Sequence, residues 1–168
     1  LQGQDIPHVD DTQIDLKVTA FIPAEWISDN EQKIKAYKDA SECTSKEELV
    51  DLAIIWSDRF GPIPNSVNTL LDVMELKLCS RTCGFSRIAS DKQNLLIETK
   101  MDEPAFRMLR KSLPEHLHGR FIYKKGHSRS SVIVRGLGVL AIEKVVEQLR
   151  DWLNKMEAGL YKNDEKNT

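Results

Sequence analysis

The sequence is poor in the features that small secreted domains and membrane proteins depend on. Its 168 residues hold only three cysteines (Cys43, Cys79 and Cys83), an odd number without the spacing of a disulfide framework. No apolar run approaches the roughly 18 residues that a membrane-spanning helix needs. A chain of this length buries roughly 70% of its unfolded surface, so it needs neither a disulfide nor a metal ion to fold. We therefore predict a protein of a reducing cytoplasm with no membrane span.

Motifs of common catalytic sites are also missing. The chain has no phosphate-binding loop, no nucleophile elbow and no H-E-x-x-H motif. Gly136 to Ala141 fits G-x-G-x-x-A, but a dinucleotide site needs a second strand with an acidic residue about 20 positions later. At that position the sequence instead predicts that the helix after this segment continues, so the second strand is missing. We interpret the segment as a strand-to-helix turn.

A zinc site is the other chemical alternative. Cys79 and Cys83 are four residues apart and could be joined by His116 and His118. This is not the spacing of a common structural zinc site. We therefore interpret the two cysteines as small buried residues.

Charge is distributed unevenly along the chain. Residues 1–84 carry 8 basic and 15 acidic side chains, a net charge of −7, whereas residues 85–168 carry 16 basic and 11 acidic ones, a net charge of +5. The total of −2 argues against general polyanion binding. Such asymmetry favours docking against a charged partner.

The predicted fold class is α+β, with an N-terminal helical layer followed by a small, mainly antiparallel sheet, packed helices and a long C-terminal helix. Alternation over residues 14–22 predicts a half-buried strand. Asp29 or Asn30 can begin a helix to about residue 41 with Ile34 and Tyr37 inward. Further helices are predicted over about 46–60 and 64–84, the latter ended by a left-handed Gly84. The second half predicts hairpins 85–99 and 120–135, a helix from residue 102 to about 113, and a last helix over 139–158.

The helix over 46–60 has the clearest pattern in the first half of the chain. Ser45 and Glu48 form a capping box at its start. At about 100° per residue, one stripe is apolar and predicts the core face. The core stripe comprises Leu49, Leu52, Ala53, Trp56 and Phe60. The opposite side comprises Glu47, Asp51 and Asp58, flanked by Ile54 and Ile55.

The hairpin over 120–135 carries the main alternative. Arg120, Lys124, Lys125 and Arg129 surround Phe121 and Tyr123, a combination that can meet phosphates and stack on bases. The competing interpretation is a solvated turn whose two aromatic residues belong to the core. Salt-dependent binding to DNA or RNA would support a nucleic-acid-binding module. Stabilisation by a nucleotide or metal ion would instead support a small enzyme.

A family resemblance rests on residues 37–64. Tyr37-Lys38-Asp39-Ala40, Glu47-Glu48-Leu49 and the stretch from Asp58 to Pro64 (D-R-F-G-P-I-P) precede a helix that ends near Gly84. This pattern resembles the C-terminal domain of the bacterial transcription-repair coupling factor (Mfd), and the resemblance runs from about Asp15 to Met156. It would also account for the absent initiator methionine, because this domain follows a motor in its parent protein.

The resemblance implies a regulatory domain and no catalysis. In that family the parent uses ATP and Mg²⁺ to move along DNA, displaces stalled RNA polymerase and recruits the repair protein UvrA. The C-terminal domain packs on an N-terminal module similar to UvrB and covers its UvrA-binding surface. The family's contact acids lie in E-L-x-D-R-F-G: Asp58 matches the second acid, whereas Ile55 stands in the place of the first.

These observations combine into one hypothesis. We expect residues 1–14 to be an extended lead-in, residues 15–158 a non-catalytic, autoinhibitory interaction domain without a cofactor of its own, and residues 159–168 a flexible tail. Its partners would be the UvrB-like module, indirectly UvrA, and through the parent RNA polymerase and DNA, with no membrane. The alternative is the nucleic-acid-binding module described above. The expected docking face comprises Glu47, Asp51, Ile54, Ile55 and Asp58.

Overall fold

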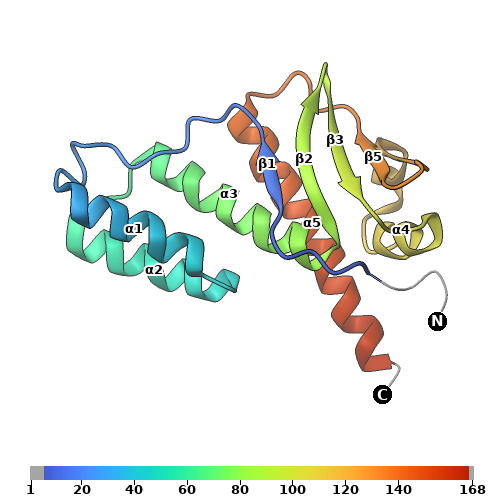
Figure 1. Cartoon of the computed structure of the whole chain (residues 1–168), viewed down its shortest axis with the longest axis horizontal. Coiled ribbons are helices and arrows are strands. Elements are labelled where there is room, and N and C mark those ends of the chain that lie inside the picture. The colour runs from blue at the N-terminus through green and yellow to red at the C-terminus, as the bar shows by residue number, and fades with distance from the viewer. Residues whose placement is uncertain (1–5, 167–168) are drawn as a thin grey trace.

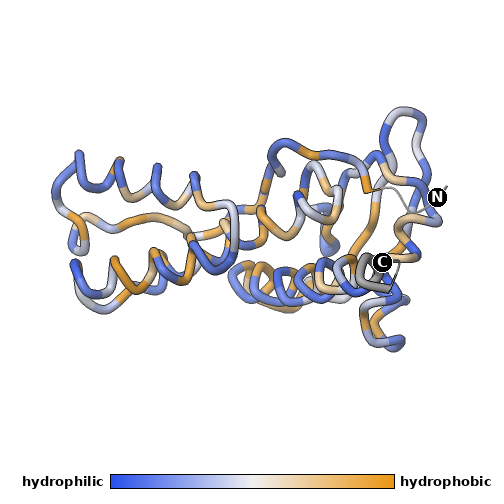
Figure 2. Tube along the Cα trace, turned by 90° about the horizontal axis from the view of Figure 1, so that it is seen from below, coloured by the Kyte–Doolittle hydropathy of each residue, from blue (hydrophilic) through white to orange (hydrophobic). Residues whose placement is uncertain are grey.

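The computed structural model describes residues 6–166, so the predicted lead-in residues 1–5 and tail residues 167–168 lie outside it. The helical layer projects from one end of the molecule, and the sheet occupies the other end (Figures 1 and 2). No helix in the described residues is both long enough and apolar enough to cross a membrane. The elements are β1 (Gln13–Asp15), α1 (Asn30–Glu42), α2 (Lys46–Phe60), α3 (Asn65–Thr82), β2 (Phe85–Asp91), β3 (Asn94–Thr99), α4 (Glu103–Arg110), the 3-10 helix η1 (Glu115–Arg120), β4 (Phe121–Lys124), β5 (Ser130–Val134) and α5 (Ile142–Lys166).

The five strands form one mixed sheet in the order β1-β2-β3-β5-β4. β1 runs parallel to β2, and the remaining neighbours are antiparallel. The two predicted hairpins are therefore confirmed as β2–β3 and β4–β5. The first closes through a turn in which Lys92 has a φ of 56°. The α+β class and the mainly antiparallel sheet follow the prediction.

Two hydrophobic clusters make up the core, and α3 contributes to both. Its N-terminal half supplies Val67 and Leu70 to a cluster with Trp56 inside the helical layer. Its C-terminal half supplies Leu76 and Cys79 to the larger cluster between the sheet, α4 and α5. The helical layer and the sheet are therefore joined by one uninterrupted helix that packs in both clusters.

Gly84 ends α3 as predicted. Its φ of 81° lies in the left-handed region, which an L side chain rarely adopts. A Cβ atom there would also lie 2.9 Å from Cγ2 of Ile6 and from Cδ of Pro7. Glycine therefore allows the N-terminal segment to cross close to the junction of α3 and β2.

The predicted strand over residues 14–22 is mostly wrong. Only Gln13–Asp15 pairs with β2, yet the alternation of burial continues to Ile22. The segment passes from the sheet cluster, where Leu16 is buried, to the helical cluster, where Ile22 is buried. An extended chain that bridges two clusters shows a period of two without a ladder of strand hydrogen bonds.

Three helix predictions also need correction. Ile34 is 68% exposed, because α1 turns its small residues Ala36 and Ala40 inward toward the helical cluster. Helix α4 ends at Arg110, before the predicted residue 113. Helix α5 begins at Ile142 and continues to Lys166, beyond the predicted end at residue 158. Its predicted inward stripe is confirmed, from Val145 to Met156.

Candidate functional site

Local sequence fixes the start and the end of α2. Ser45 is the N-cap, and its hydroxyl accepts the Glu48 backbone N–H at 3.1 Å. The Glu48 carboxylate accepts the Thr44 backbone N–H at 2.6 Å, one residue before the cap. At the other end Gly61 has a φ of 91° and stops the helix. The register of the fifteen-residue helix is thus set by its caps as well as by its core stripe.

The core stripe of α2 is confirmed. Leu49 and Trp56 are buried, and Leu52, Ala53 and Phe60 are partly buried. Trp26 packs edge-on against both Trp56 and Phe60, with ring centroids 6.0 Å and 5.5 Å apart. The Trp26 indole N–H donates to the Gly61 carbonyl at 3.4 Å. This aromatic group fixes the orientation of α2 about its axis.

The side of α2 opposite Trp56 is exposed, and we call it the α2 face. At about 100° per residue its members fall within one arc of roughly 100°. Ile54 and Ile55 are 56% and 59% exposed, which is unusual for large aliphatic residues. The α2 face comprises Glu47, Asp51, Ile54, Ile55 and Asp58, all exposed.

The acids of the α2 face lack basic partners. Within the described residues, neither Asp51 nor Asp58 forms an ion pair or a side-chain hydrogen bond. Arg59, next to Asp58 in sequence, instead places its guanidinium 5.2 Å from the centroid of the Phe60 ring. The carboxylates therefore remain available to a partner outside this domain.

A shallow groove of about 280 Å³ borders the α2 face on the side of α1. Leu52, Cys43 and Ile55 give it an apolar floor. Lys35 neutralises Asp39 at 2.9 Å, whereas Asp51 has no ion-pair partner among the described residues. The groove extends the acidic and aliphatic character of the α2 face. Its acidic lining comprises Asp39, Glu42, Glu48 and Asp51.

The aromatic residues of the basic hairpin are part of the core. Phe121 is 1% exposed and packs edge-on against Trp152, with centroids 5.5 Å apart. The Tyr123 ring stacks on Phe106, and its hydroxyl lies 2.8 Å from the Met101 carbonyl oxygen. Neither ring is presented to solvent for stacking on a base.

The four basic residues of this hairpin have different surroundings. Arg120 donates to the Gly136 carbonyl at 3.1 Å, and Arg129 forms an ion pair with Glu98 at 3.3 Å. Lys124 and Lys125 are exposed. The basic side chains and the aromatic rings of the hairpin therefore do not lie on one common surface. The G-x-G-x-x-A segment forms the turn before α5.

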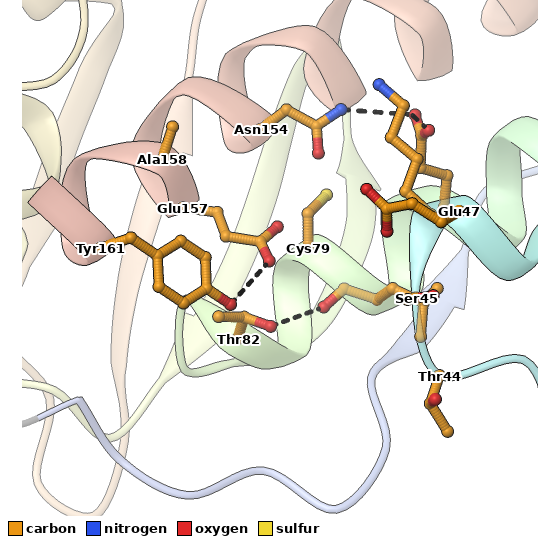
Figure 3. Close-up of a pocket in the computed structure, with 12 residues that line it drawn as sticks. Thr44, Ser45, Glu47, Cys79, Thr82, Asn154, Glu157, Ala158 and Tyr161 are labelled. Carbon is orange, nitrogen blue, oxygen red and sulfur yellow. Dashed lines mark hydrogen bonds and ion pairs between the residues drawn. The ribbon is translucent and has the colours of Figure 1, made fainter.

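A second cleft, of about 510 Å³, lies where α2, α3 and α5 meet (Figure 3). Figure 3 shows Glu47 and Glu157 directed toward the same space, with Cys79 between them, so Glu47 at the N-terminal end of the α2 face also lines this cleft. Burial raises the pKa of Glu157, and the charges of Glu47 and Glu75 raise it further, against a hydrogen bond from Tyr161 and the charge of Lys46. No sequence pattern predicts this cleft, because its walls come from three segments far apart in the chain, residues 44–47, 75–82 and 154–161.

The residues considered for a zinc site do not come together. Cys79 and Cys83 are buried, in agreement with their interpretation as core residues, and burial raises the pKa of each thiol. Nε2 of His118 lies 2.8 Å from the Leu113 carbonyl oxygen. Across the described part of the chain, no group of three or more histidine, cysteine, aspartate or glutamate side chains could hold a metal ion.

Comparisons with known proteins agree on one family. The model of the TRCF domain matches residues 16–107. A transcription-repair-coupling factor of Staphylococcus epidermidis is 23% identical over 92% of this chain, and one of Staphylococcus aureus is 24% identical over 89%. The chain spans about 12% of the length of these relatives.

The fold also has a solved counterpart. A crystal structure of the C-terminal domain of a transcription-repair coupling factor matches with a TM-score of 0.72 at 16% identity. The match covers 90% of this chain and 95% of that domain. The chain belongs to the TRCF domain family, the family of the C-terminal, non-motor domain of transcription-repair coupling factors.

Proposed function

We propose that this domain is an autoinhibitory clamp and that the α2 face is its intramolecular docking face. In this role it packs on the UvrB-like module of its parent and masks the UvrA-binding surface. The clamp is released when the ATP-driven translocase engages stalled RNA polymerase. The observation that carries the proposal is the α2 face itself: acids and exposed isoleucines on one arc, with no ion-pair partner for Asp51 or Asp58 in the described residues.

The chemistry of the α2 face defines what should meet it. Asp58 and Asp51 require basic groups, and the isoleucines beside them require an apolar surface. Ile55 occupies the place where the family pattern has an acid, so this contact is more apolar than the family pattern implies. We infer a module surface with at least one arginine or lysine flanked by aliphatic residues.

Tethering makes a weak contact sufficient. A module on the same chain acts at an effective concentration on the order of mM. An intrinsic dissociation constant of about 10 μM would then hold the closed form near 100:1, roughly 2.7 kcal/mol. A competing partner can open a clamp of this strength.

Catalysis belongs elsewhere in the parent under this proposal. The domain itself would use no cofactor, whereas ATP and Mg²⁺ would serve the motor that moves on DNA. The setting would be transcription-coupled nucleotide-excision repair in the bacterial cytoplasm. The basic side chains and aromatic rings of the 120–135 hairpin do not form a shared surface, so the nucleic-acid-binding alternative receives no support from a specific contact.

The test compares UvrA binding by the full-length parent and by its Asp58→Ala variant. If the clamp depends on Asp58, the variant weakens closure by about 1–3 kcal/mol for a desolvated pair, and UvrA binds more tightly. Glu115→Ala is the matched control, because Glu115 is an exposed acid on η1, away from α2. Equal UvrA binding by wild type and Asp58→Ala, with both domains folded, would remove Asp58 from the clamp.

A further inference from the structure

The face of the sheet turned away from α3 and α5 carries an aliphatic row. Cross-strand register places Ala89 of β2 opposite Leu96 of β3, Leu96 opposite Ile133 of β5, and Ile133 opposite Ile122 of β4. Neighbouring strands lie about 4.8 Å apart, so these four side chains form a continuous row. Their exposure increases across the sheet, from buried Ala89 through half-buried Leu96 and Ile133 to exposed Ile122.

The opposite face of the sheet is the core face. Ile88, Ile97 and Val132 form the next row, point toward the helices, and are each 0% exposed. Figure 1 shows α3 and α5 on one side of the sheet. We call the side with the Leu96–Ile133–Ile122 row the sheet face.

Charges on the sheet face are partly neutralised within the domain. Nε of Arg87 lies 2.6 Å from the Asp15 carboxylate, and its Nη1 lies 3.2 Å from Glu98. Arg129 adds a second bond to Glu98 at 3.3 Å. These four groups cancel one another, so they contribute little net field beside the aliphatic row.

The charges left over near Ile122 are positive, and the exposed Asp91 lies on β2, with β3 and β5 between it and β4. Lys124 follows Ile122 by two residues on the same strand, so it lies on the same face of the sheet. Arg135 directly follows β5, and it is exposed like Lys124 and Lys125. None of these three forms an ion pair with a described residue. The exposed end of the aliphatic row is therefore bordered by basic side chains that form no ion pair with a described residue.

A protein segment fits this surface better than a nucleic acid does. The rings of Phe121 and Tyr123 are turned into the core, so no aromatic platform is available for bases. Aliphatic side chains have no counterpart on a phosphate backbone, and the ion pairs of Asp15 and Glu98 with Arg87 and Arg129 leave little net positive charge on those two arginines to attract one. An aliphatic row bordered by lysine and arginine side chains is complementary to a protein segment in which aliphatic residues alternate with acidic ones.

We propose that the sheet face is a second docking surface, which binds an acidic segment of a partner protein through aliphatic side chains laid along Leu96, Ile133 and Ile122. Lys124 and Arg135 meet the carboxylates of that segment. The surface is opposite in charge to the α2 face and belongs to a different part of the fold. The domain can therefore hold a basic surface on α2 and an acidic segment on the sheet at the same time.

The test uses backbone amide NMR spectra of the 168-residue domain titrated with defined probes. The first probe is a 12-residue peptide in which leucine alternates with glutamate. Two control peptides replace glutamate with lysine, or leucine with serine. A 12-nucleotide single-stranded DNA is the fourth probe, and the spectra of the domain alone at rising concentration report self-association.

We expect the Leu/Glu peptide to shift resonances of β3, β4 and β5 and to bind at least about threefold more tightly than either control peptide. Ile122→Thr and Lys124→Glu should each weaken that binding by a similar factor. Ile34→Thr and Lys38→Glu on α1 are the matched controls and should leave it unchanged, since both residues are exposed far from the sheet.

Four results would overturn the proposal. They are no binding of the Leu/Glu peptide, equal binding of the control peptides, tighter binding of the DNA at the same residues, and self-association through the sheet face. The Thr substitution keeps a β-branched side chain in β4, so the strand is expected to persist in that variant. An unchanged spectrum outside the substituted strand would verify this.

Discussion

Arg150 of α5 reaches across to α3, where its Nε lies 3.0 Å from Oε2 of Glu75. The same guanidinium contacts Asp72 one turn earlier on α3, and Asp151 at 3.1 Å. Asn154, one turn further along α5, donates to Glu75 at 3.3 Å. One arginine therefore neutralises two partly buried acids and joins the two longest helices of the domain.

Burial and charge act in opposite senses on this network. Burial raises the pKa of Asp72, and the nearby Arg150 only partly offsets it. For Arg150, burial alone would lower the pKa, but Asp72, Asp151 and Glu75 together raise it. Arg150 therefore favours the charged form of the partly buried Asp72, and several acids together stabilise the charge of Arg150.

Replacement of Arg150 should accordingly destabilise the domain. Arg150→Met keeps much of the length but leaves Asp72 and Glu75 without their shared cation, and we expect a loss of about 2–4 kcal/mol in the free energy of unfolding. Arg150→Lys should lose less, because the charge remains and the forked contacts do not. Urea unfolding monitored by circular dichroism measures both.

The control for this prediction is an exposed pair. Arg107→Met removes an ion pair with Glu103 at 3.0 Å between residues four apart on α4. Such surface pairs contribute about 0.5 kcal/mol or less. A loss for Arg150→Met no larger than that for Arg107→Met would show that the α3–α5 network is not structural.

The cleft between α2, α3 and α5 makes a prediction about pH. Because the pKa of Glu157 is raised in the folded state, its protonated form is favoured there, and that contribution to stability is lost as pH rises through the folded pKa. At pH 7 the charged carboxylate is therefore a net cost. Glu157→Gln should stabilise the domain at pH 7 by less than about 1 kcal/mol, since the group is only partly buried and solvent screens its charge.

The gain from Glu157→Gln should disappear as pH falls below the folded pKa, where the wild-type carboxyl is already neutral. Thermal unfolding at a series of pH values between about 3 and 8 measures the difference. Glu25→Gln is the control, because Glu25 is an exposed acid in a turn. A Glu157→Gln gain that is constant across this range would rule out the titration of Glu157 as its cause.

Much of the helical layer could be predicted from local patterns. The spacing of Leu49, Trp56 and Phe60 fixes the phase of α2, and the caps at Ser45 and Gly61 fix its ends. These are interactions within one segment, so the sequence contains all the information needed. The exposed members of the α2 face follow from the same phase.

What could not be predicted depends on contacts between distant segments. Residues 16–22 alternate like a strand, but whether a second strand lies beside them is decided by the position of the helical layer. Ala36, and not Ile34, faces the helical cluster. Which residue of α1 faces inward depends on how α1 packs against α2 and α3. The ion pair of Arg150 with Glu75 joins residues 75 positions apart. No sequence pattern in α3 or α5 predicts that these two residues meet.

Truncation of Trp56 tests the phase of α2 directly. Trp56 is 3% exposed and packs against Trp26, so Trp56→Ala should cost about 3–5 kcal/mol through lost contacts and a cavity. Ile54→Ala on the exposed side is the matched change and should cost less than about 0.5 kcal/mol. Similar melting temperatures for the two variants would show that the assigned phase is wrong and would relocate the α2 face.

Asp58 should be dispensable for the stability of the isolated domain. It lies in the last turn of α2, where the helix dipole disfavours a carboxylate by about 0.3–1 kcal/mol, and no described residue forms an ion pair with it. Asp58→Ala and Asp58→Asn should therefore leave the free energy of unfolding within about 0.5 kcal/mol of wild type, with any change toward higher stability. Urea unfolding of the 168-residue domain measures this. A loss above about 1 kcal/mol for both variants would make Asp58 a structural residue, and the effect of its substitution on UvrA binding could then no longer be assigned to a docking contact.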